Sequence, residues 1–311
     1  MSVTVVGSIA FDAVTTPLGS RDRMLGGSAV YFSLAASFFD TVQVVGPVGD
    51  DFGEEEYDVL RARGIRTEDI EHVPGGQTFF WRGEYGWDLN ERQTLDTQLG
   101  VFADFDPKLS APSASADLLF LANIQPDLQR AVRQQCQQAR FVALDSMNFW
   151  IETARDSLIE TMGVVDCVML NDSELRELTG EPNLVRAARR IREWGPRLVV
   201  AKQGVYGAAL ISEDGFFALP AFPLETVVDP TGAGDCFAGG FIGYIAAQPG
   251  EEPGHELFAR AMAYGTAVAS FSVEEFGVER LTRLTGDEIA ERVAELRRIT
   301  QFTAQPVWLR T

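Results

Sequence analysis

The sequence VVDPTGAGDCFAGGFIGYI, at positions 227–245, joins an apolar segment to a helical pattern through a glycine-rich turn. Apolar residues recur at helical spacing after the turn, so we expect a helix that begins near Gly234. Unpaired backbone N–H groups and the helix dipole favour an anion at such an N-terminus. The amides of Gly232, Ala233 and Gly234 therefore predict an anion-binding turn. Asp235 would lie beside the anion, in the first turn of the helix.

The same residues also have a purely structural interpretation. Asp235 can cap the helix, and the glycines can simply form a tight turn. The stretch differs from two known phosphate-binding patterns, because it lacks the third glycine of GxGxxG and no lysine follows it as in a Walker A loop. On this stretch alone, both interpretations stay open.

The composition limits what the protein can bind. The 311 residues are 46% apolar and 23% charged, which is typical of a folded globular chain. A formal net charge of −19 argues against a general surface for nucleic acid or anionic membrane, since both attract positive charge. Any phosphate-bearing ligand must then be held by backbone amides, metal ions and a few local cations. The chain has only two lysines, Lys108 and Lys202.

The cysteines and the apolar runs argue against a secreted or membrane protein. Cys136, Cys167 and Cys236 are too few and too scattered for a disulfide framework or a zinc site. No basic leader precedes the first apolar run, and no run reaches the roughly 18 apolar residues that a membrane helix needs. We therefore expect a cytoplasmic protein.

Short apolar runs alternate with helical patterns along the chain. The strand-like runs span 3–7, 42–46, 118–122, 141–145, 167–170 and 197–201, and the helical patterns span 28–39, 54–64, 128–139 and 185–195. The last third adds a hairpin at 207–220 and two helices near 255–272 and 286–299. This alternation predicts right-handed crossovers, a mostly parallel central sheet and a single α/β domain over residues 1–311.

One region departs from this pattern. Residues 75–102 read as polar and aromatic strands separated by Gly and Asn turns. Together with residues 11–25 they predict a small sheet that stands off the main one. No repeat or Pro-rich linker marks a second independent domain, so we interpret this sheet as a lid.

Three further stretches carry candidate site residues. Asn171 ends a predicted strand and Glu174 lies in the next helical turn, at the sheet edge where open α/β sheets bind ligands. Their oxygens can face a hydrated magnesium ion, but N-x-x-E is also a helix capping box. Gly26 and Gly27 precede a helix and allow a ligand to approach the backbone closely, or they form a simple turn. Asp12 follows the first strand, where it can accept hydrogen bonds from substrate hydroxyls or start a turn.

Taken together and in this order, the stretches resemble the ribokinase-like (PfkB-type) carbohydrate kinase family. DPTGAGDCFAGGF, at 229–241, is similar to the C-terminal motif of that family nearly position for position. The glycine pair at 26–27, the N-x-x-E at 171–174 and VVAKQGVYGA at 199–208 resemble its other motifs. The resemblance runs from about residue 3 to residue 300. It implies a three-layer fold with a mostly parallel central sheet and a small β-sheet lid.

The resemblance also implies a reaction and its residues. An ATP-dependent kinase would move the γ-phosphate to a hydroxyl of a small sugar or polyol, with Asp235 as general base and the amides of residues 232–234 as an anion hole. Phosphoryl transfer needs positioning and charge stabilisation more than covalent help. The other implied contacts are Asp12, Gly26, Gly27, Tyr31 and Asn123 for the acceptor, Lys202, Gly204, Gly207 and Thr231 for the nucleotide, Asn171 and Glu174 for magnesium through water, and Asp229 for a monovalent cation such as potassium.

The acceptor is the part that the sequence leaves open. The family usually has a polar residue, commonly Asn, four places after the second glycine, whereas this chain has the bulkier Tyr31. A nucleoside is the alternative acceptor, because the lid aromatics can stack on a base or else form lid core or a dimer contact. The lid-side candidates are Phe79, Phe80, Trp81, Arg82, Tyr85, Trp87, Asn90 and Arg92, and Gln125 is a further candidate after the strand at 118–122. A homodimer through the lid is a further expectation.

Three other classes fit less well. A catalytically silent binding homologue would be expected to lose Asp235 or the glycines, and both are intact. A dinucleotide-dependent oxidoreductase lacks its glycine fingerprint after the first strand. A Ser-His-Asp hydrolase would need His72 or His255 as its base, and both lie in hydrophilic stretches that suggest an exposed position.

Overall fold

A computed structural model describes residues 1–90 and 92–302 of the chain. Its strands are β1 Ser2–Val6, β2 Ala10–Thr16, β3 Gly19–Gly26, β4 Thr41–Val48, β5 Arg66–His72, β6 Phe79–Tyr85, β7 Arg92–Gln98, β8 Leu118–Leu121, β9 Phe141–Asp145, β10 Cys167–Asn171, β11 Leu198–Lys202, β12 Ala208–Ser212 and β13 Phe216–Leu219. The α-helices are α1 Ser28–Ala36, α2 Glu54–Arg61, α3 Ala111–Ala114, α4 Pro126–Gln135, α5 Asn148–Thr153, α6 Arg155–Met162, α7 Asp172–Thr179, α8 Leu184–Arg192, α9 Ala233–Ala246, α10 His255–Ser272, α11 Glu279–Arg283 and α12 Gly286–Thr300. Two 3₁₀ turns, η1 Gly100–Asp104 and η2 Gly204–Tyr206, complete the set.

Nine strands form the central sheet in the order β13-β12-β11-β10-β9-β8-β1-β4-β5. The strands from β11 to β5 run parallel, and the hairpin of β12 and β13 adds two antiparallel strands at one edge. Each parallel neighbour is reached through a helical crossover, as the alternating sequence pattern predicts. The carboxyl ends of the parallel strands therefore meet at one edge of the sheet.

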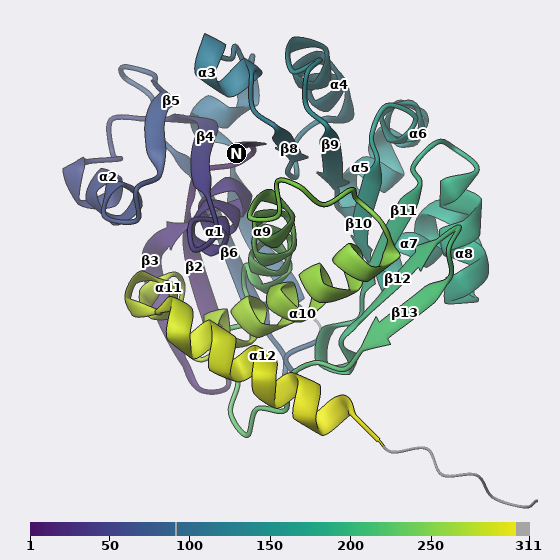
Figure 1. Ribbon diagram of the computed structural model, residues 1–311. Helices are drawn as coiled ribbons and strands as arrows, with labels where there is room; N and C mark the ends of the chain where they lie inside the picture. The colour runs from purple at the N-terminus through teal and green to yellow at the C-terminus, as the bar shows by residue number, and fades with distance from the viewer. Residues whose placement is uncertain (91, 303–311) are drawn as a thin grey trace, which may run out of the picture.

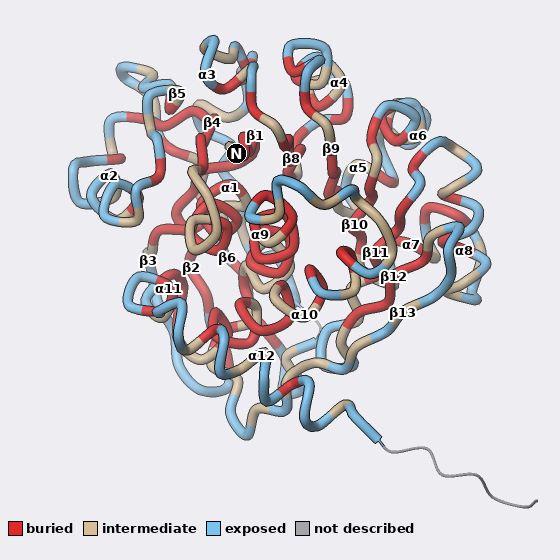
Figure 2. Tube along the Cα trace, viewed as in Figure 1, coloured by how far each residue is buried: buried red, intermediate tan, exposed pale blue. Residues whose placement is uncertain are grey.

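Helices cover the central sheet on both faces, which gives three layers (Figure 1). Successive strand residues point to opposite faces, so Phe141 packs in the core beneath α1, α9 and α10 while Val142 packs in the core beneath α4, α6, α7 and α8. Figure 2 shows the buried strands and α9 at the centre and the exposed outer helices around them. A strand buried on both faces reads as a continuous apolar run, which is the pattern that the sequence shows.

Close packing of α9 against α1 explains the glycines that follow the turn at 232–234. A Cβ at Gly239 would lie 2.4 Å from the carbonyl oxygen of Phe32, in α1. Small residues at such positions let two helix backbones approach closely. None of the helices in residues 1–90 and 92–302 is long and apolar enough to cross a membrane.

A second sheet of four strands, in the order β3-β2-β6-β7, stands beside the first. Its strands fall within the two segments, 11–25 and 75–102, that the sequence assigns to a lid, with shifts of one residue at their ends. A small core of Val14, Tyr85 and Phe276 joins this lid sheet to the loop between α10 and α11. Whether the lid sheet opens and closes stays a prediction.

The predicted fold class is confirmed. The predicted helices and strands differ from the observed ones at an edge strand, at the start of one helix and in two short helices. Strand β5, with the sequence RTEDIEH, was not predicted, because it is an edge strand with Ile70 as its one buried residue and so lacks an apolar run. The helix after the glycine turn begins at Ala233, one residue before the predicted start. Helices α5 and α6 were not predicted either, since both are short.

Candidate active site

Three strand ends and the first turn of α9 converge at the carboxyl edge of the central sheet. Asp145 ends β9, Asn171 ends β10 and Lys202 ends β11. The turn formed by residues 232–234, called the glycine turn below, brings Asp235 to the same place. Ligands of open α/β sheets bind at this edge.

The glycine turn depends on a residue without a side chain. Gly232 has a φ of 74°, in the left-handed region, and a Cβ there would lie 2.4 Å from the ring of Tyr31. The N–H of Ala233 donates to the carbonyl of Pro230 at 3.2 Å, so that amide is already bonded. The N–H groups of Gly232 and Gly234 donate to no backbone carbonyl in the part of the chain that the structure describes. Two amides are thus free to face an anion.

Asp235 is half-buried and does not cap its helix. Its side chain makes no hydrogen bond with any described residue, and α9 has no side-chain cap. Burial, and after it the nearby Asp145, raise the pKa of Asp235, Lys202 and Arg92 lower it, and the net result is a pKa of about 7. A carboxyl group with a pKa near neutrality can accept a proton from a substrate at physiological pH.

Lys202 forms a buried ion pair with Asp145. Its Nζ lies 2.6 Å from Oδ2 of Asp145, and the two side chains are 16% and 7% exposed. Burial lowers the pKa of Lys202, but Asp145 and Glu174 outweigh burial and raise it above its usual range. The ammonium group also lies next to the glycine turn, because a Cβ at Gly234 would be 3.2 Å from Nζ. A fixed positive charge thus lies beside the two free amides.

Asn171 and Glu174 form a capping box at the start of α7. The N–H of Glu174 donates to Oδ1 of Asn171 at 2.8 Å, and the N–H of Asn171 donates to Oε2 of Glu174 at 2.9 Å. Burial and Asp145 raise the pKa of Glu174, which faces Lys202. The second carboxylate oxygen of Glu174 keeps its capacity to accept. No group of three or more His, Cys, Asp or Glu side chains gathers as a metal site within residues 1–90 and 92–302.

The carboxylate of Asp12 packs directly against the backbone of Gly26. A Cβ at Gly26 would be 2.0 Å from Oδ2 of Asp12, so only glycine permits this approach. The amide of Gly27 donates a hydrogen bond to the Asp12 carboxylate, while burial and Asp229 raise its pKa to about 7. The structure therefore brings Asp12, Gly26 and Gly27 together at one point, near Asp235.

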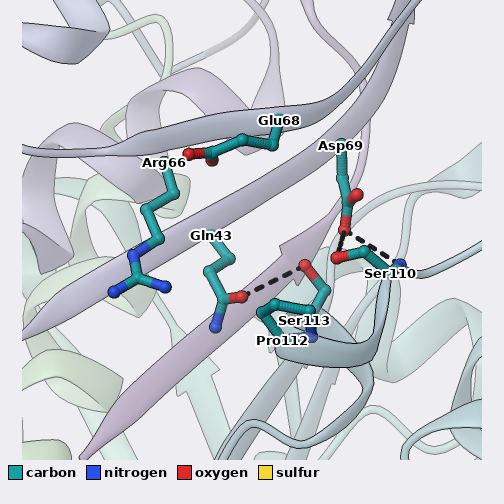
Figure 3. Close-up of a pocket in the computed structure, with 7 residues that line it drawn as sticks. All are labelled: Gln43, Arg66, Glu68, Asp69, Ser110, Pro112 and Ser113. Atoms are coloured by element: carbon teal, nitrogen blue, oxygen red, sulfur yellow. Dashed lines mark hydrogen bonds between the residues drawn. The ribbon is translucent and has the colours of Figure 1, made fainter.

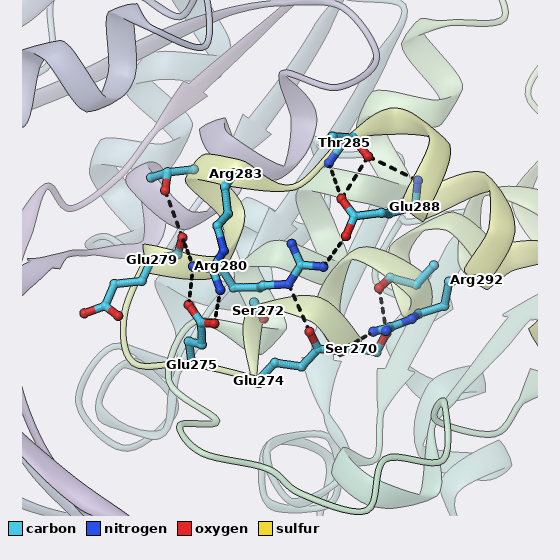
Figure 4. A network of polar contacts seen from close by, with 12 residues as sticks. Ser270, Ser272, Glu274, Glu275, Glu279, Arg280, Arg283, Thr285, Glu288 and Arg292 are labelled. Carbon is cyan, nitrogen blue, oxygen red and sulfur yellow. Dashed lines mark hydrogen bonds and ion pairs between the residues drawn. The ribbon is translucent and has the colours of Figure 1, made fainter.

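Asp229 is held by backbone amides on both of its oxygens. The N–H of Thr231 donates to Oδ1 at 2.9 Å, and the N–H of Gly277 donates to Oδ2 at 3.0 Å. Gly277 belongs to the loop between α10 and α11. A network of ion pairs around Arg280 holds this loop, with Glu274 at 3.0 Å and Glu288 at 2.6 Å (Figure 4). These ion pairs thus hold the loop that carries Gly277, whose amide donates to Asp229, the candidate ligand of a monovalent cation.

The lid segment 75–102 reaches Thr231, next to the glycine turn, and Gly204, in the segment 199–208. Oγ1 of Thr231 donates to the hydroxyl of Tyr85 at 3.2 Å. Arg92 pairs in register with Tyr85 across β6 and β7, and its charge lowers the pKa values of Asp12 and Asp235. Oδ1 of Asn90 lies 3.3 Å from where a Cβ at Gly204 would be. The lid sheet is therefore positioned over the site.

Three predicted contacts lie in surroundings that the sequence did not suggest. Tyr31 is 1% exposed and belongs to the core beneath the glycine turn, and its hydroxyl has no partner among the described residues. Asn123 accepts from Nε1 of Trp150 at 3.0 Å and donates to Sδ of Met147 at 2.9 Å, which occupies both ends of its amide. Gln125 is the N-cap residue of α4. A direct contact between these groups and an acceptor stays a prediction.

A separate cavity of about 130 Å³ lies at the opposite edge of the sheet (Figure 3). Its lining includes Gln43 and Arg66, which lie at the amino ends of β4 and β5, away from the catalytic edge. Its polar groups bond one another, with Ser113 donating to Gln43 at 3.3 Å and the hydroxyl of Ser110 donating to Asp69 at 2.8 Å. This cavity is therefore not the candidate active site.

Comparison with known proteins agrees with this geometry. Residues 3–283 match the pfkB family of carbohydrate kinases. The chain belongs to the pfkB carbohydrate kinase family. A cytidine kinase of Thermococcus kodakarensis is 30% identical over 81% of this chain and 91% of its own length. A nucleoside kinase of Methanothermobacter thermautotrophicus is 26% identical over 93% of this chain and 95% of its own length.

Solved structures show the same fold as this kinase. A Burkholderia thailandensis nucleoside kinase in complex with ADP-inosine has a TM-score of 0.80, at 18% identity, over 99% of each chain. The ribokinase of Thermotoga maritima has a TM-score of 0.75, at 21% identity, over 94% of this chain and 99% of its own. The ribokinase-like fold predicted from the motifs is thus confirmed. Because the chain belongs to this kinase family, a Ser-His-Asp hydrolase and a dinucleotide-dependent oxidoreductase are no longer alternatives.

Asp145 is a residue of the site that the sequence reasoning missed. Asp145 follows a predicted strand just as Asn171 does, so its position at a strand end was a signal that could have been used. Lys202 was assigned to the nucleotide by resemblance, but its ion pair with Asp145 joins residues 57 positions apart and leaves no local pattern. His72 pairs with Asp50 at the surface, and His255 packs against Phe217 and is half-buried, not exposed as expected.

Proposed function

We propose that this kinase transfers the γ-phosphoryl group of ATP to a hydroxyl of a nucleoside, with Asp235 as the general base. One observation carries the proposal. The half-buried Asp235 carboxylate has no hydrogen-bond partner among the described residues and stands beside the two free amides of the glycine turn. A base and an anion-binding turn are the two elements that phosphoryl transfer to an alcohol requires of the protein.

The reaction balances with these groups. The acceptor oxygen forms a bond to the γ-phosphorus as the bond from that phosphorus to the bridging oxygen of ADP breaks. The acceptor hydroxyl gives its proton to Asp235, and ADP leaves with the bridging oxygen. The amides of Gly232 and Gly234 would hold the negative charge on the moving phosphoryl group.

The residues present fit magnesium and ATP as the expected companions. ATP supplies the phosphoryl group, and Mg²⁺ supplies positive charge to its phosphates. Asn171 and Glu174 bond each other, so they would hold magnesium through water molecules. Gly204, Gly207 and the other residues of 199–208 would line the nucleotide, as the resemblance implies. Asp229 keeps lone pairs on both oxygens, and a potassium ion beside it stays a prediction.

The lid sheet favours a nucleoside over the free sugar or polyol that we placed first from the sequence. Trp81 is half-buried and pairs in register with Asp12 across β2 and β6. An indole beside a carboxylate can stack on a base while the carboxylate binds the ribose hydroxyls. The similarity to a cytidine kinase and to nucleoside kinases supports the same choice. Phe79 is instead stacked on Phe102 at 5.4 Å. Trp81 also packs against the core of Val14, Tyr85 and Phe276 and its Nε1 donates to Thr94, so a base would use the part of the ring that stays exposed.

A sugar acceptor is the second candidate. A 2-dehydro-3-deoxygluconokinase of Thermoproteus tenax is 27% identical over 71% of this chain, and the fold also matches ribokinases. Asp12 can bind the hydroxyls of either acceptor. A cytoplasmic location and a homodimer through the lid stay predictions. The alternative to an enzyme stays a catalytically silent protein that binds the ligand.

An ADP-release assay with magnesium tests the proposal. Cytidine, inosine, ribose, fructose and 2-dehydro-3-deoxygluconate would each be supplied as acceptor, with and without potassium. We expect the highest kcat/KM for a nucleoside, and Trp81→Leu should raise the KM for that nucleoside about tenfold with a smaller effect on ribose. A sugar that outperforms both nucleosides would favour the second candidate, and no release with any acceptor would favour the silent homologue.

A further inference from the structure

Lys202 is a half-buried lysine in a chain whose other cations, apart from Lys108, are arginines. The chain has 26 basic residues, of which only Lys202 and Lys108 are lysines. Lys108 is 84% exposed and pairs with Asp106 at the surface, whereas Lys202 is 16% exposed and lies at the catalytic edge of the sheet. The position at the end of β11 therefore requires the shape of a lysine side chain as well as its positive charge.

The space around the ammonium group explains this choice. Nζ lies 2.6 Å from Asp145 on one side, and a Cβ at Gly234 would lie 3.2 Å from it on the other. A compact ammonium group fits between the strand end and the glycine turn, while the planar fork of an arginine is larger. Three N–H donors point from Nζ, and one of them is used by Asp145. The other two donors are not used by Asp145, and Nζ lies next to Gly234 of the glycine turn.

Asp145 holds the ammonium group in place. Its Oδ2 accepts from Lys202, and its Oδ1 accepts from the N–H of Ser146 at 2.8 Å. Both oxygens are thus fixed, at a residue that is 5% exposed. A charge pair this well buried restricts the lysine to one orientation, and that orientation directs it toward the glycine turn.

We propose that Lys202 binds the transferring phosphoryl group together with the glycine turn, and that Asp145 is its positioning residue. This inference rests on the proposed kinase function and assigns to this lysine the γ-phosphate in particular, where the resemblance gave it only to the nucleotide. The positive charge stabilises the negative charge that moves from ADP to the acceptor. A preorganised donor of this kind acts most strongly in a site that excludes water.

Two kinds of measurement test the proposal. The first is the single-turnover rate of transfer to cytidine, or to the best acceptor of the ADP-release assay. The second is calorimetric binding, with magnesium, of ADP and of β,γ-methylene-ATP, which carries a γ-phosphate and does not react. The variants are Lys202→Met, Lys202→Arg and the double variant Lys202→Met/Asp145→Asn, which leaves no unpaired buried carboxylate. Lys108→Met is the matched control.

Lys202→Met should slow transfer by about 10²–10³-fold, the loss typical of removing one oxyanion donor. It should also remove most of the advantage of β,γ-methylene-ATP over ADP, while the Kd for ADP changes by less than about threefold. Lys202→Arg should recover part of the rate, the double variant should remain folded and slow, and Lys108→Met should behave as the parent.

Other results would overturn the inference. If Lys202→Met weakens ADP and the analogue equally, the lysine binds the nucleotide in general and not its γ-phosphate. If the double variant transfers at the parent rate, the pair is structural. Asp235→Asn separates the two proposals: a parent that transfers, a dead Asp235→Asn and an unaffected Lys202→Met would contradict only the role of Lys202. If the parent transfers to no acceptor, the comparison of ADP with the analogue still decides whether Lys202 reads the γ-phosphate.

Discussion

Asp235 is surrounded by charges of both signs, and these set when it can act as a base. Burial, Asp145 and Asp12 raise its pKa, Lys202 and Arg92 lower it, and the net result is about 7. Only the ionised form accepts a proton, so kcat/KM should rise about tenfold per pH unit below pH 7 and level off above it. A pH series of kcat/KM checks this expectation. A flat profile through pH 7 would mean that Asp235 is not the titrating base.

Tyr31 can be tested separately as a core residue and as an acceptor contact. Its hydroxyl is buried without a partner among the described residues, and an unbonded buried hydroxyl destabilises a protein. Tyr31→Phe should therefore leave the free energy of unfolding unchanged or raise it by about 1 kcal/mol, with KM for the acceptor unchanged. Chemical denaturation and steady-state kinetics measure the two quantities. A several-fold rise in KM would instead restore the acceptor contact that the sequence suggested.

At the residue scale, local patterns revealed only part of the site. The glycine turn and Asp235 are contiguous, so their spacing alone indicates an anion-binding helix start. Asp145, Lys202 and Arg92 reach the same point from three different strands, and pairing of this kind leaves no mark in a single stretch of sequence. For Tyr31 the sequence left two interpretations open, a core residue or an acceptor contact, and its burial depends on how α1 packs beneath the turn.

At the scale of elements, the position of α9 against α1 should control stability more than chemistry. A Cβ at Gly239 would be 2.4 Å from the carbonyl oxygen of Phe32, which is backbone and cannot move freely. Gly239→Ala should therefore lower the free energy of unfolding by about 1–3 kcal/mol. Gly286→Ala is the control, because a Cβ there meets no atom within 4 Å. Equal stability of the two variants would show that the helices are not packed this closely.

The elements themselves were largely predictable where burial imposes a pattern. Strands such as β9 and β11 are buried on both faces and read as apolar runs, and the hairpin of β12 and β13 was marked by its turn. Edge strand β5 was not predicted, because most of its residues are exposed or half-buried and so form no apolar run. Crossover rules predict the right-handed connections, but they give neither the order of the strands nor the register between them.

At the scale of the whole molecule, a hydrogen bond links lid strand β6 to Thr231, next to the glycine turn. Oγ1 of Thr231 donates to the hydroxyl of Tyr85 at 3.2 Å. Removing it with Tyr85→Phe should weaken closure by about 0.5–1.5 kcal/mol, and ATP hydrolysis without acceptor should rise several-fold relative to transfer. Tyr244→Phe is the control, because it removes a hydroxyl hydrogen bond of the same length, from Arg260 at 3.2 Å, in the last turn of α9. An unchanged ratio of hydrolysis to transfer would contradict a role for the lid in excluding water.

The buried acids of the site also set the balance between stability and activity. Asp12 and Asp235 both have a pKa of about 7, above the usual value near 3.8. The folded state therefore binds more protons than the unfolded state between about pH 4 and 7, so their contribution to stability is lost as the pH rises through 7. Replacing such an acid with a neutral amide should stabilise the protein above pH 7, at the expense of its function.

Asp235→Asn therefore gives the most direct measurement, with single-turnover phosphoryl transfer and Tm recorded together at pH 8. We expect transfer to fall by about 10²–10⁴-fold, with the Kd for ADP unchanged and Tm equal to or above that of the parent. Transfer at the parent rate in this variant would contradict the role of Asp235 and, with it, the proposed mechanism.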